Sequence, residues 1–198
     1  MLRLYETRSR EVRPIEGRDG ILNVYCCGPT VYRDAHVGNL RTFLLSDLIS
    51  RAATVSGLKV TLIQNITDVG HLATDLEDKI LAQSKSESLD PFVIARKYED
   101  RFHVDLNRLN IQPAHLYPRA SENIPLMISA IEKLIADGFA YVATDGNVYF
   151  DAQSFPTYGA ISGNRLDSLK PGHRYEYSED GAKRFHADWA LWKLARDR

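Results

Sequence analysis

The sequence predicts an α/β fold that begins with a parallel strand–helix–strand unit, and three observations support this prediction. Residues 21–25 alternate in the manner of a strand, and residues 59–64 form a β-branched, apolar run typical of a second strand. Between them, four apolar residues have the i, i+3, i+4, i+7 spacing of one helix face: Leu45, Leu48, Ile49 and Ala52. Gly57 is a good stop for that helix. Elements in this order form a crossover unit, which places the ends of both strands on one rim of the sheet.

Three polar stretches outside this unit are interpreted as loops. Residues 1–20 are polar and irregular, with Gly17 and Gly20 framing a turn before the first strand. Residues 68–86 are mostly polar and charged, and we expect an exposed loop that runs into a short helix. Residues 151–185 are richer in glycine, proline and charge, which predicts an extended, loop-rich piece.

Two further helices are predicted in the middle of the chain. Asp90 and Pro91 make a clean start for a helix that runs to about Asn110, and a second helix runs from about Glu122 to Asp137. Both helices carry apolar stripes that we interpret as core packing rather than cofactor contacts: Ala95, Tyr98, Phe102, Leu106 and Leu109 in the first, and Ile124, Met127, Ile128, Ile131 and Ile135 in the second.

A β-hairpin is predicted around the dipeptide Asp145-Gly146. Residues 139–144 and 147–150 flank this dipeptide and have the composition of strands. The sequence contains neither an internal repeat nor a low-complexity tract.

The loop after the first strand, within residues 25–42, carries the residues with a chemical role. A loop between a strand and a helix is where an α/β sheet binds nucleotides, because the free N–H groups at the helix start attract phosphate. His36 and Asn39 can each offer a hydrogen-bond donor there, and Gly38 lets a nucleotide lie close to the backbone. The crossover would bring this loop next to Asn65, at the end of the second strand.

A family resemblance rests on these residues. Cys-Gly-Pro-Thr-Val-Tyr at residues 27–32, followed by His-Val-Gly-Asn at residues 36–39, resembles the cysteinyl-tRNA synthetases, class I enzymes with a His-x-Gly-His signature. The resemblance continues in order along nearly the whole chain, at Gln64–Val69, Pro156–Gly159 and Ala190–Lys193.

Two departures from the usual family pattern resemble one known variation. Asn39 stands where the signature has its second histidine, and residues 70–76 intervene before Glu77-Asp78-Lys79. A branch of the same family carries both a similar Gly-His-Leu extension and the asparagine.

The resemblance implies the Rossmann-like class I synthetase nucleotide-binding fold, with an inserted α+β connective segment. Residues 1–112 would be the first half of the ATP-binding catalytic domain, and residues 113–186 the connective insertion. Residues 187–198 would be the start of the second half, where the segment Asp188–Lys193 resembles the chain returning to that fold.

The activity that the resemblance implies is the ligation of cysteine to tRNA(Cys). ATP and L-cysteine would form cysteinyl-adenylate, with Mg²⁺ accompanying ATP, and the cysteinyl group would then pass to tRNA. His36 and Asn39 would be the catalytic residues, holding the triphosphate at the start of the helix. The ATP- and adenylate-binding residues would be Gly28, Thr30, His36, Gly38, Asn39, Thr42, Asn65 and Thr67.

Cys27 is the metal-binding candidate. Adjacent cysteines are a poor geometry for a disulfide with each other, and strand alternation points Cys26 and Cys27 to opposite faces, so Cys26 is interpreted as a small buried hydrophobe. The resemblance implies that Cys27 is one of four ligands of Zn²⁺, which takes the thiolate of the substrate cysteine. The other family ligands would lie beyond Arg198. Five histidines lack ligand spacing with Cys27: His71, His103, His115, His173 and His186.

Composition restricts the function further. The chain of 198 residues is 44% hydrophobic and 26% charged, which suits an ordinary globular protein. Its formal net charge of −1 gives no excess of basic residues to suggest a nucleic-acid partner, although a local basic patch remains compatible with it. No apolar run approaches the roughly 20 residues of a membrane span, and the N-terminus does not have the pattern of a secretory signal. We therefore expect a cytoplasmic protein.

Rival functions stay open at this point. We expect these 198 residues to be an incomplete N-terminal piece that is inactive alone, because the lysine-rich second signature loop of the family would also lie beyond Arg198. One alternative is a cysteine ligase that acts on an amine such as an amino-sugar. Another is a non-enzymatic truncated paralogue used as a binding module. A generic His-x-Gly-His nucleotidyltransferase would explain neither Cys27 nor Asn-Ile-Thr-Asp.

Overall fold

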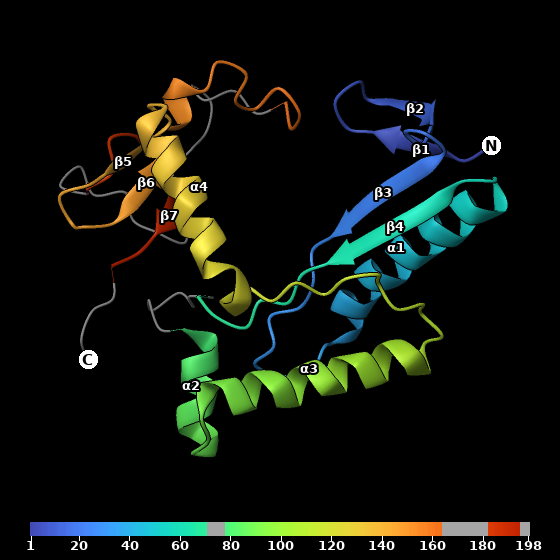
Figure 1. Ribbon diagram of the computed structural model, residues 1–198, viewed down its shortest axis with the longest axis horizontal. Helices are drawn as coiled ribbons and strands as arrows, with labels where there is room; N and C mark the ends of the chain where they lie inside the picture. Colours follow the sequence, from blue (N-terminus) through green and yellow to red (C-terminus); the bar gives the residue numbers. More distant parts are fainter. Residues whose placement is uncertain (71–77, 164–181, 195–198) are drawn as a thin grey trace. The chain divides into compact units, whose positions relative to one another are not determined.

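The computed structural model describes residues 1–70, 78–163 and 182–194, and the chain divides into two compact units (Figure 1). Each is defined by its residues: unit 1 is Met1–Leu4 with Val12–Ile124, and unit 2 is Tyr5–Glu11 with Pro125–Arg198.

The centre of unit 1 is the predicted strand–helix–strand crossover. Strand β3 (Ile21–Cys26) pairs in parallel with β4 (Lys59–Gln64), and Cys26 lies opposite Gln64 in the register. Helix α1 (Val37–Val55) connects the two strands. Figure 1 shows α1 running alongside the two strands. This prediction is confirmed, including the placement of both strand ends on one rim.

A further segment runs beside β4 on the edge away from β3. The backbone N–H of Gln64 donates to the carbonyl of Leu116 (3.0 Å), and that of Ile66 donates to the carbonyl of Pro118 (2.9 Å). Parallel bridges join Ile63 to Leu116 and Ile66 to Arg119. The sheet hydrogen bonding therefore continues past the end of β4.

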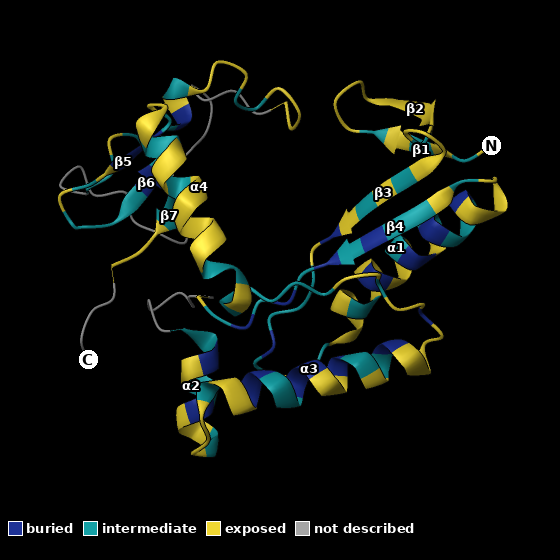
Figure 2. Cartoon of the chain, in the orientation of Figure 1, coloured by how far each residue is buried: buried dark blue, intermediate teal, exposed yellow. Residues whose placement is uncertain are grey.

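Helices α2 (Lys79–Glu87) and α3 (Pro91–Arg108) complete unit 1, together with the short 3₁₀ turn η1 (Ser121–Asn123). The predicted start of α3 is confirmed, since the Asp90 carboxylate accepts from the N–H groups of Phe92 and Val93. The rings of Phe43 on α1 and Phe102 on α3 meet edge to face at 5.1 Å between centroids. Figure 2 shows buried residues of this unit on β4, α1, α2 and α3.

The apolar residues that predicted α1 do not mark its buried face. Leu45 and Leu48 are 57% and 53% exposed, whereas the helix buries Phe43, Asp47, Ser50 and Ala53. A helix can bury the Asp47 carboxylate here because the N–H of Gln112 and the guanidinium of Arg51 both donate to it. The other two residues of the stripe, Ile49 and Ala52, are intermediate in exposure, so apolar spacing located the helix but not the face that it buries.

Two expectations for loops are also corrected. The first twenty residues contain a two-stranded sheet of β1 (Arg3–Glu6) and β2 (Glu11–Pro14), whose turn is stabilised by N–H groups donating to the Glu6 carboxylate. Asp68 is 2% exposed rather than in an exposed loop, since charged and polar partners satisfy its carboxylate. The short helix expected after it is α2.

Unit 2 contains an antiparallel sheet and a helix. Strands β5 (Ala140–Val142) and β6 (Val148–Phe150) form the predicted hairpin, in which Gly146 has a φ of +79° that favours glycine. The Asp145 carboxylate accepts from the N–H of Asn147 and tightens the turn. A 3₁₀ turn, η2 (Ala152–Ser154), follows β6.

Strand β7 (Trp189–Trp192) pairs antiparallel with β6, giving the sheet order β5-β6-β7. The segment that the family resemblance assigns to the second half of the nucleotide fold thus pairs with the hairpin through Trp189, Ala190 and Trp192. The boundaries 1–112, 113–186 and 187–198 stay predictions.

Helix α4 (Ile124–Ala136) has the expected position but not the expected burial. None of its residues is buried by the part of the chain that the structure describes, and Met127 and Ile128 are 38% and 41% exposed. Figure 2 shows the helix as exposed and intermediate over most of its length. The prediction that its apolar stripe packs in a core is therefore wrong for the described residues.

Candidate functional site

Asn65 links the end of β4 to the loop that follows β3. Its Oδ1 accepts hydrogen bonds from the backbone N–H of Gly28 (3.0 Å) and the hydroxyl of Tyr25 (2.8 Å), and its Nδ2 donates to Oγ1 of Thr67 (3.2 Å). Burial raises the pKa of the Tyr25 hydroxyl, so this group keeps the proton that it donates. Three of the predicted site residues thus form one hydrogen-bonded cluster.

Thr30 and Thr67 meet through the backbone. The N–H of Thr67 donates to the carbonyl of Pro29 (3.0 Å), and the N–H of Val31 donates to the carbonyl of Thr67 (3.2 Å). Thr30 and Thr67 accordingly form a parallel bridge. The prediction that the crossover brings the two segments together is confirmed, although they lie nearly forty positions apart in sequence.

Gly28 is required by this close approach. A Cβ at this position would lie 1.5 Å from the carbonyl oxygen of Asn65, which is a backbone atom that cannot move aside. The Cγ atom of Gln64 would lie 3.2 Å away on the same added atom. Any side chain at residue 28 would therefore push the loop off the end of β4.

His36 is the N-cap residue of α1. Its Nδ1 accepts from the N–H of Gly38 (3.0 Å), and Oδ1 of Asn39 accepts from the N–H of His36 (3.4 Å), which completes a capping box. A neutral imidazole whose Nδ1 accepts a hydrogen bond carries its proton on Nε2. The cap thus leaves Nε2–H of His36 and Nδ2 of Asn39 to donate to a ligand.

Gly38 and Thr42 extend this group along the first turns of α1. A Cβ on Gly38 would lie 2.9 Å from Cε1 of His36, so the glycine makes room for the capping ring. Thr42 follows Gly38 by four residues, which places both on the same face of the helix. His36, Gly38, Asn39 and Thr42 are all exposed, as a ligand-binding helix start must be.

The family comparison agrees with these motifs. The catalytic domain of class I (C) tRNA synthetases matches residues 14–198. The chain belongs to this family. It is 42% identical to a cysteine–tRNA ligase of Deinococcus radiodurans, over 97% of this chain and 39% of the relative.

Other relatives give the same result. A cysteine–tRNA ligase of Thermus thermophilus is 42% identical over 97% of this chain and 40% of its own, and one of Chlorobium chlorochromatii is 40% identical over 99% and 41%. The chain therefore spans about two fifths of the length of these curated relatives. The resemblance stated from the sequence, and the class I synthetase fold that it implies, are confirmed.

The two cysteines of this synthetase chain differ as expected. Cys26 is buried, and burial raises the pKa of its thiol, whereas Cys27 is exposed. Among the described residues, no group of three or more His, Cys, Asp or Glu side chains is arranged to hold a metal ion. Cys27 can offer a single thiolate, which does not fit a zinc site by itself.

The histidines that lack metal-ligand spacing with Cys27 make other contacts. Nδ1 of His115 accepts from the backbone N–H of Leu62 (3.0 Å), and the ring of His103 packs edge to face on Tyr117 at 4.6 Å. The ring of His186 lies 4.2 Å from that of Phe185. His71 and His173 lie outside the described residues.

Sequence reasoning missed a group of charged residues that begins at Asp68, the residue after Thr67 of this site. Asp68 accepts from the N–H and the hydroxyl of Ser121 and from Arg96, and Arg96 also donates to the buried carboxylate of Glu99. The one available signal was the carboxylate that ends the motif Asn-Ile-Thr-Asp. Its partners lie 28 and 53 residues away, where no local pattern marks them.

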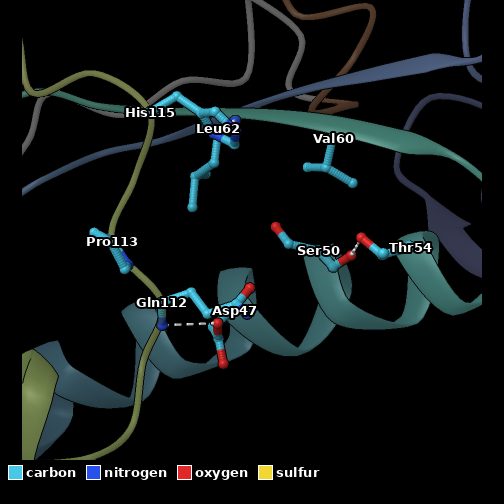
Figure 3. A pocket seen from close by; sticks show the side chains of 8 residues that line it. All are labelled: Asp47, Ser50, Thr54, Val60, Leu62, Gln112, Pro113 and His115. Atoms are coloured by element: carbon cyan, nitrogen blue, oxygen red, sulfur yellow. Dashed lines mark hydrogen bonds between the residues drawn. The ribbon is translucent and has the colours of Figure 1, made fainter.

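A hollow of about 200 Å³ lies in unit 1, away from the predicted site (Figure 3). It is lined by Asp47 and Ser50 of α1, by Leu62 of β4 and by His115, and none of the predicted site residues borders it.

The helices in the described ranges lack the combination of length and apolar character needed to cross a membrane.

Proposed function

We propose that this chain belongs to a cysteine–tRNA ligase and binds ATP at the start of α1 for the activation of L-cysteine. The observation that carries the proposal is the pairing of the loop at Gly28–Thr30 with Asn65 and Thr67, next to a capped helix start that presents His36 and Asn39. The printed names of the relatives, cysteine–tRNA ligases, support the choice of amino acid and of tRNA as acceptor.

The first proposed step is attack of the cysteine carboxylate on the α-phosphorus of ATP. The new bond joins a carboxylate oxygen to that phosphorus, and the bond to the bridging oxygen breaks, so that pyrophosphate leaves with the electron pair. Mg²⁺ accompanying ATP would neutralise part of the phosphate charge. In the second step a ribose hydroxyl of tRNA would attack the activated carbonyl, and AMP would leave.

The protein groups act by position and by charge. Negative charge grows on the leaving pyrophosphate, and Nε2–H of His36 and Nδ2 of Asn39 are fixed at the positive end of the α1 dipole to stabilise it. Gly28, Thr30, Asn65 and Thr67 would line the adenylate, with Thr42 on the neighbouring helix face. Zinc takes no step in this proposal, because Cys27 is one ligand and not a site. A cytoplasmic location belongs to the proposal as well.

The test is cysteine-dependent ATP–pyrophosphate exchange, measured on this chain and on a chimera in which it replaces the matched stretch of the Deinococcus radiodurans relative. We expect exchange in the chimera with cysteine but not with serine, and none with the chain alone. A folded chimera that exchanges only with another amino acid, or not at all, would contradict the proposal.

The variant His36→Asn separates the proposed role of His36 as a hydrogen-bond donor to the nucleotide from its role as the N-cap of α1. Asparagine is among the best N-cap residues, so stability should stay within about 0.5 kcal/mol, while losing the Nε2 donor should slow exchange by about 10²-fold. The matched control is Asp90→Ala, which removes the α3 cap at a cost of about 1 kcal/mol and should leave exchange unchanged. Equal exchange rates in the chimera with and without His36→Asn would show that this histidine only caps α1.

A further inference from the structure

A buried carboxylate stands at the end of the segment that carries Asn65 and Thr67. The side chain of Asp68 has 0% relative exposure. Its Oδ1 accepts from the N–H of Ser121 (2.9 Å), and its Oδ2 accepts from the Ser121 hydroxyl (2.6 Å) and from a guanidinium nitrogen of Arg96 (3.2 Å). A charge removed from water at this depth persists only when it is paired and hydrogen-bonded, and Asp68 satisfies both conditions.

Residues 65–68 alternate in the direction of their hydrogen bonds. Asn65 and Thr67 bond towards the loop at 28–31, whereas Ile66 and Asp68 bond towards residues 118–121. The N–H of Ile66 donates to the carbonyl of Pro118 (2.9 Å), and the N–H of Ala120 donates to the carbonyl of Ile66 (2.9 Å). The loop at residues 28–31 is thus bonded to one side of residues 65–68, and the contacts of Asp68 fix the other side.

The partners of Asp68 are themselves fixed. Arg96 also donates to Glu99 (2.5 Å), a second carboxylate that is only 3% exposed. Arg119 reaches the same carboxylate through Nε and a terminal nitrogen, and it pairs with Glu122 through the other terminal nitrogen (2.8 Å). Two guanidinium groups therefore serve three carboxylates, and helix α3 anchors the network because it supplies both Arg96 and Glu99.

We propose that Asp68 is a positioning residue of the nucleotide site: by clamping the end of residues 65–68 to Ser121 and Arg96, it holds Asn65 and Thr67 in the register that shapes the loop at Gly28–Thr30. This proposal rests on the function proposed above. Asp68 itself does not touch the nucleotide. Its loss acts through the Thr67 backbone, whose N–H and carbonyl bond to Pro29 and Val31.

The test compares Asp68→Asn with Asp47→Asn. Asp47 is an equally buried carboxylate of unit 1 that is paired with Arg51. Figure 3 shows its hydrogen bond from the N–H of Gln112, and its carboxylate bonds to none of residues 65–68. Both variants remove one buried charge and should lower the melting temperature. With both variants placed in the chimera described above, we expect only Asp68→Asn to raise the KM for ATP in pyrophosphate exchange, by about tenfold, with a smaller change in the KM for cysteine.

Backbone amide exchange provides a readout that is independent of activity. In Asp68→Asn, peptides that cover residues 28–31 and 65–68 should exchange faster than in Asp47→Asn. The milder variant Ser121→Ala removes one bond to Asp68 but keeps the charge, and it should shift both readouts in the same direction by less. It also serves if Asp68→Asn fails to fold.

The outcomes separate the two proposals. Equal amide exchange in the Asp68 and Asp47 variants, or faster exchange with an unchanged KM for ATP, would overturn the positioning role. If the folded chimera without these substitutions lacks cysteine-dependent pyrophosphate exchange, the proposed function fails, and the Asp68 clamp is then decided by amide exchange together with ATP binding in a calorimetric titration.

Discussion

The two units are each held by a buried carboxylate, but they surround it with different chemistry. In unit 1, Asp68 accepts from Ser121 and from the cation Arg96. In unit 2, Asp188 is 2% exposed and accepts from neutral donors: the Tyr141 hydroxyl (2.6 Å) and the N–H groups of Ala152 (2.9 Å) and Phe185 (3.1 Å). The charged network of Asp68 adjoins the candidate site, whereas neutral donors to Asp188 hold the loops of unit 2 together.

The units also differ in how their cores form. Unit 1 depends on parallel pairing between distant strands and on aliphatic and aromatic packing of α1 against α3. Unit 2 depends on a local antiparallel hairpin and on stacked rings, such as Phe150 on Trp189 at 4.3 Å. The comparison predicts that unit 1 loses more stability from a core truncation than unit 2 loses from a similar change in its ring cluster.

The largest expected effect is that of Phe102→Ala. Phe102 is 2% exposed and contacts Phe43, so its truncation should cost about 3–5 kcal/mol of the free energy of unfolding. The matched change in unit 2, Phe155→Ala, removes a ring that is 43% exposed and should cost about 1 kcal/mol. Unfolding in denaturant, followed by circular dichroism, measures both. Equal costs would remove the distinction between the two cores.

An intermediate effect is expected for Asp188→Asn. The amide group has one acceptor oxygen in place of two, so at least one buried donor loses its partner, at a cost of about 2 kcal/mol. The two tryptophans of the chain are Trp189 and Trp192, both in β7, so their fluorescence reports on unit 2 alone. The fluorescence transition should move to lower denaturant while the helical signal of unit 1 moves less. Coincident shifts of both signals would mean that the two units unfold together.

Local patterns located most elements of both units, although not β1 and β2, while partners distant in sequence decided what those elements bury. The N-cap of α3, the turn at Asp145-Gly146 and both strands of the crossover depend on neighbouring residues, and all were predicted. The inner face of α1 was not, because burial of Asp47 depends on Gln112, which lies 65 residues away. For the same reason, a reading of single residues took Asp68 for part of a loop.

The candidate site shows the same division. The grouping of Gly28 and Thr30 with Asn65 and Thr67 follows from crossover topology, which a sequence pattern can supply. The sequence offered one donor each from His36 and Asn39, and only the structure shows that the capping box occupies Nδ1 of His36 and Oδ1 of Asn39 and leaves Nε2–H and Nδ2 as the donors. The roles of these residues in catalysis stay predictions.

The smallest expected effect tests whether electrostatic contacts at the surface of unit 1 matter as much as its buried network. Hydrogen bonds from Lys97, Gln83 and Tyr98 lower the pKa of the Glu87 carboxyl to about 2. A carboxyl whose pKa is lower in the folded state stabilises that state above its unfolded pKa of about 4.3. This contribution should therefore be lost as the pH falls from about 4.5 to about 2.

The measurement is the melting temperature at several pH values between 5 and 2 for the parent chain and for Glu87→Gln. Other carboxyls titrate in the same range, so the informative quantity is the difference between the two proteins, which should shrink as the pH falls. The control is Asp137→Asn, which breaks an exposed pair with Lys133 and should leave the pH dependence unchanged, because such pairs contribute little to stability. Parallel pH profiles for Glu87→Gln and the parent chain would mean that the contact between α2 and α3 at Glu87 contributes as little to stability as an exposed ion pair does. A converging profile would instead mean that α2 is held to α3 by a charge that is lost at low pH.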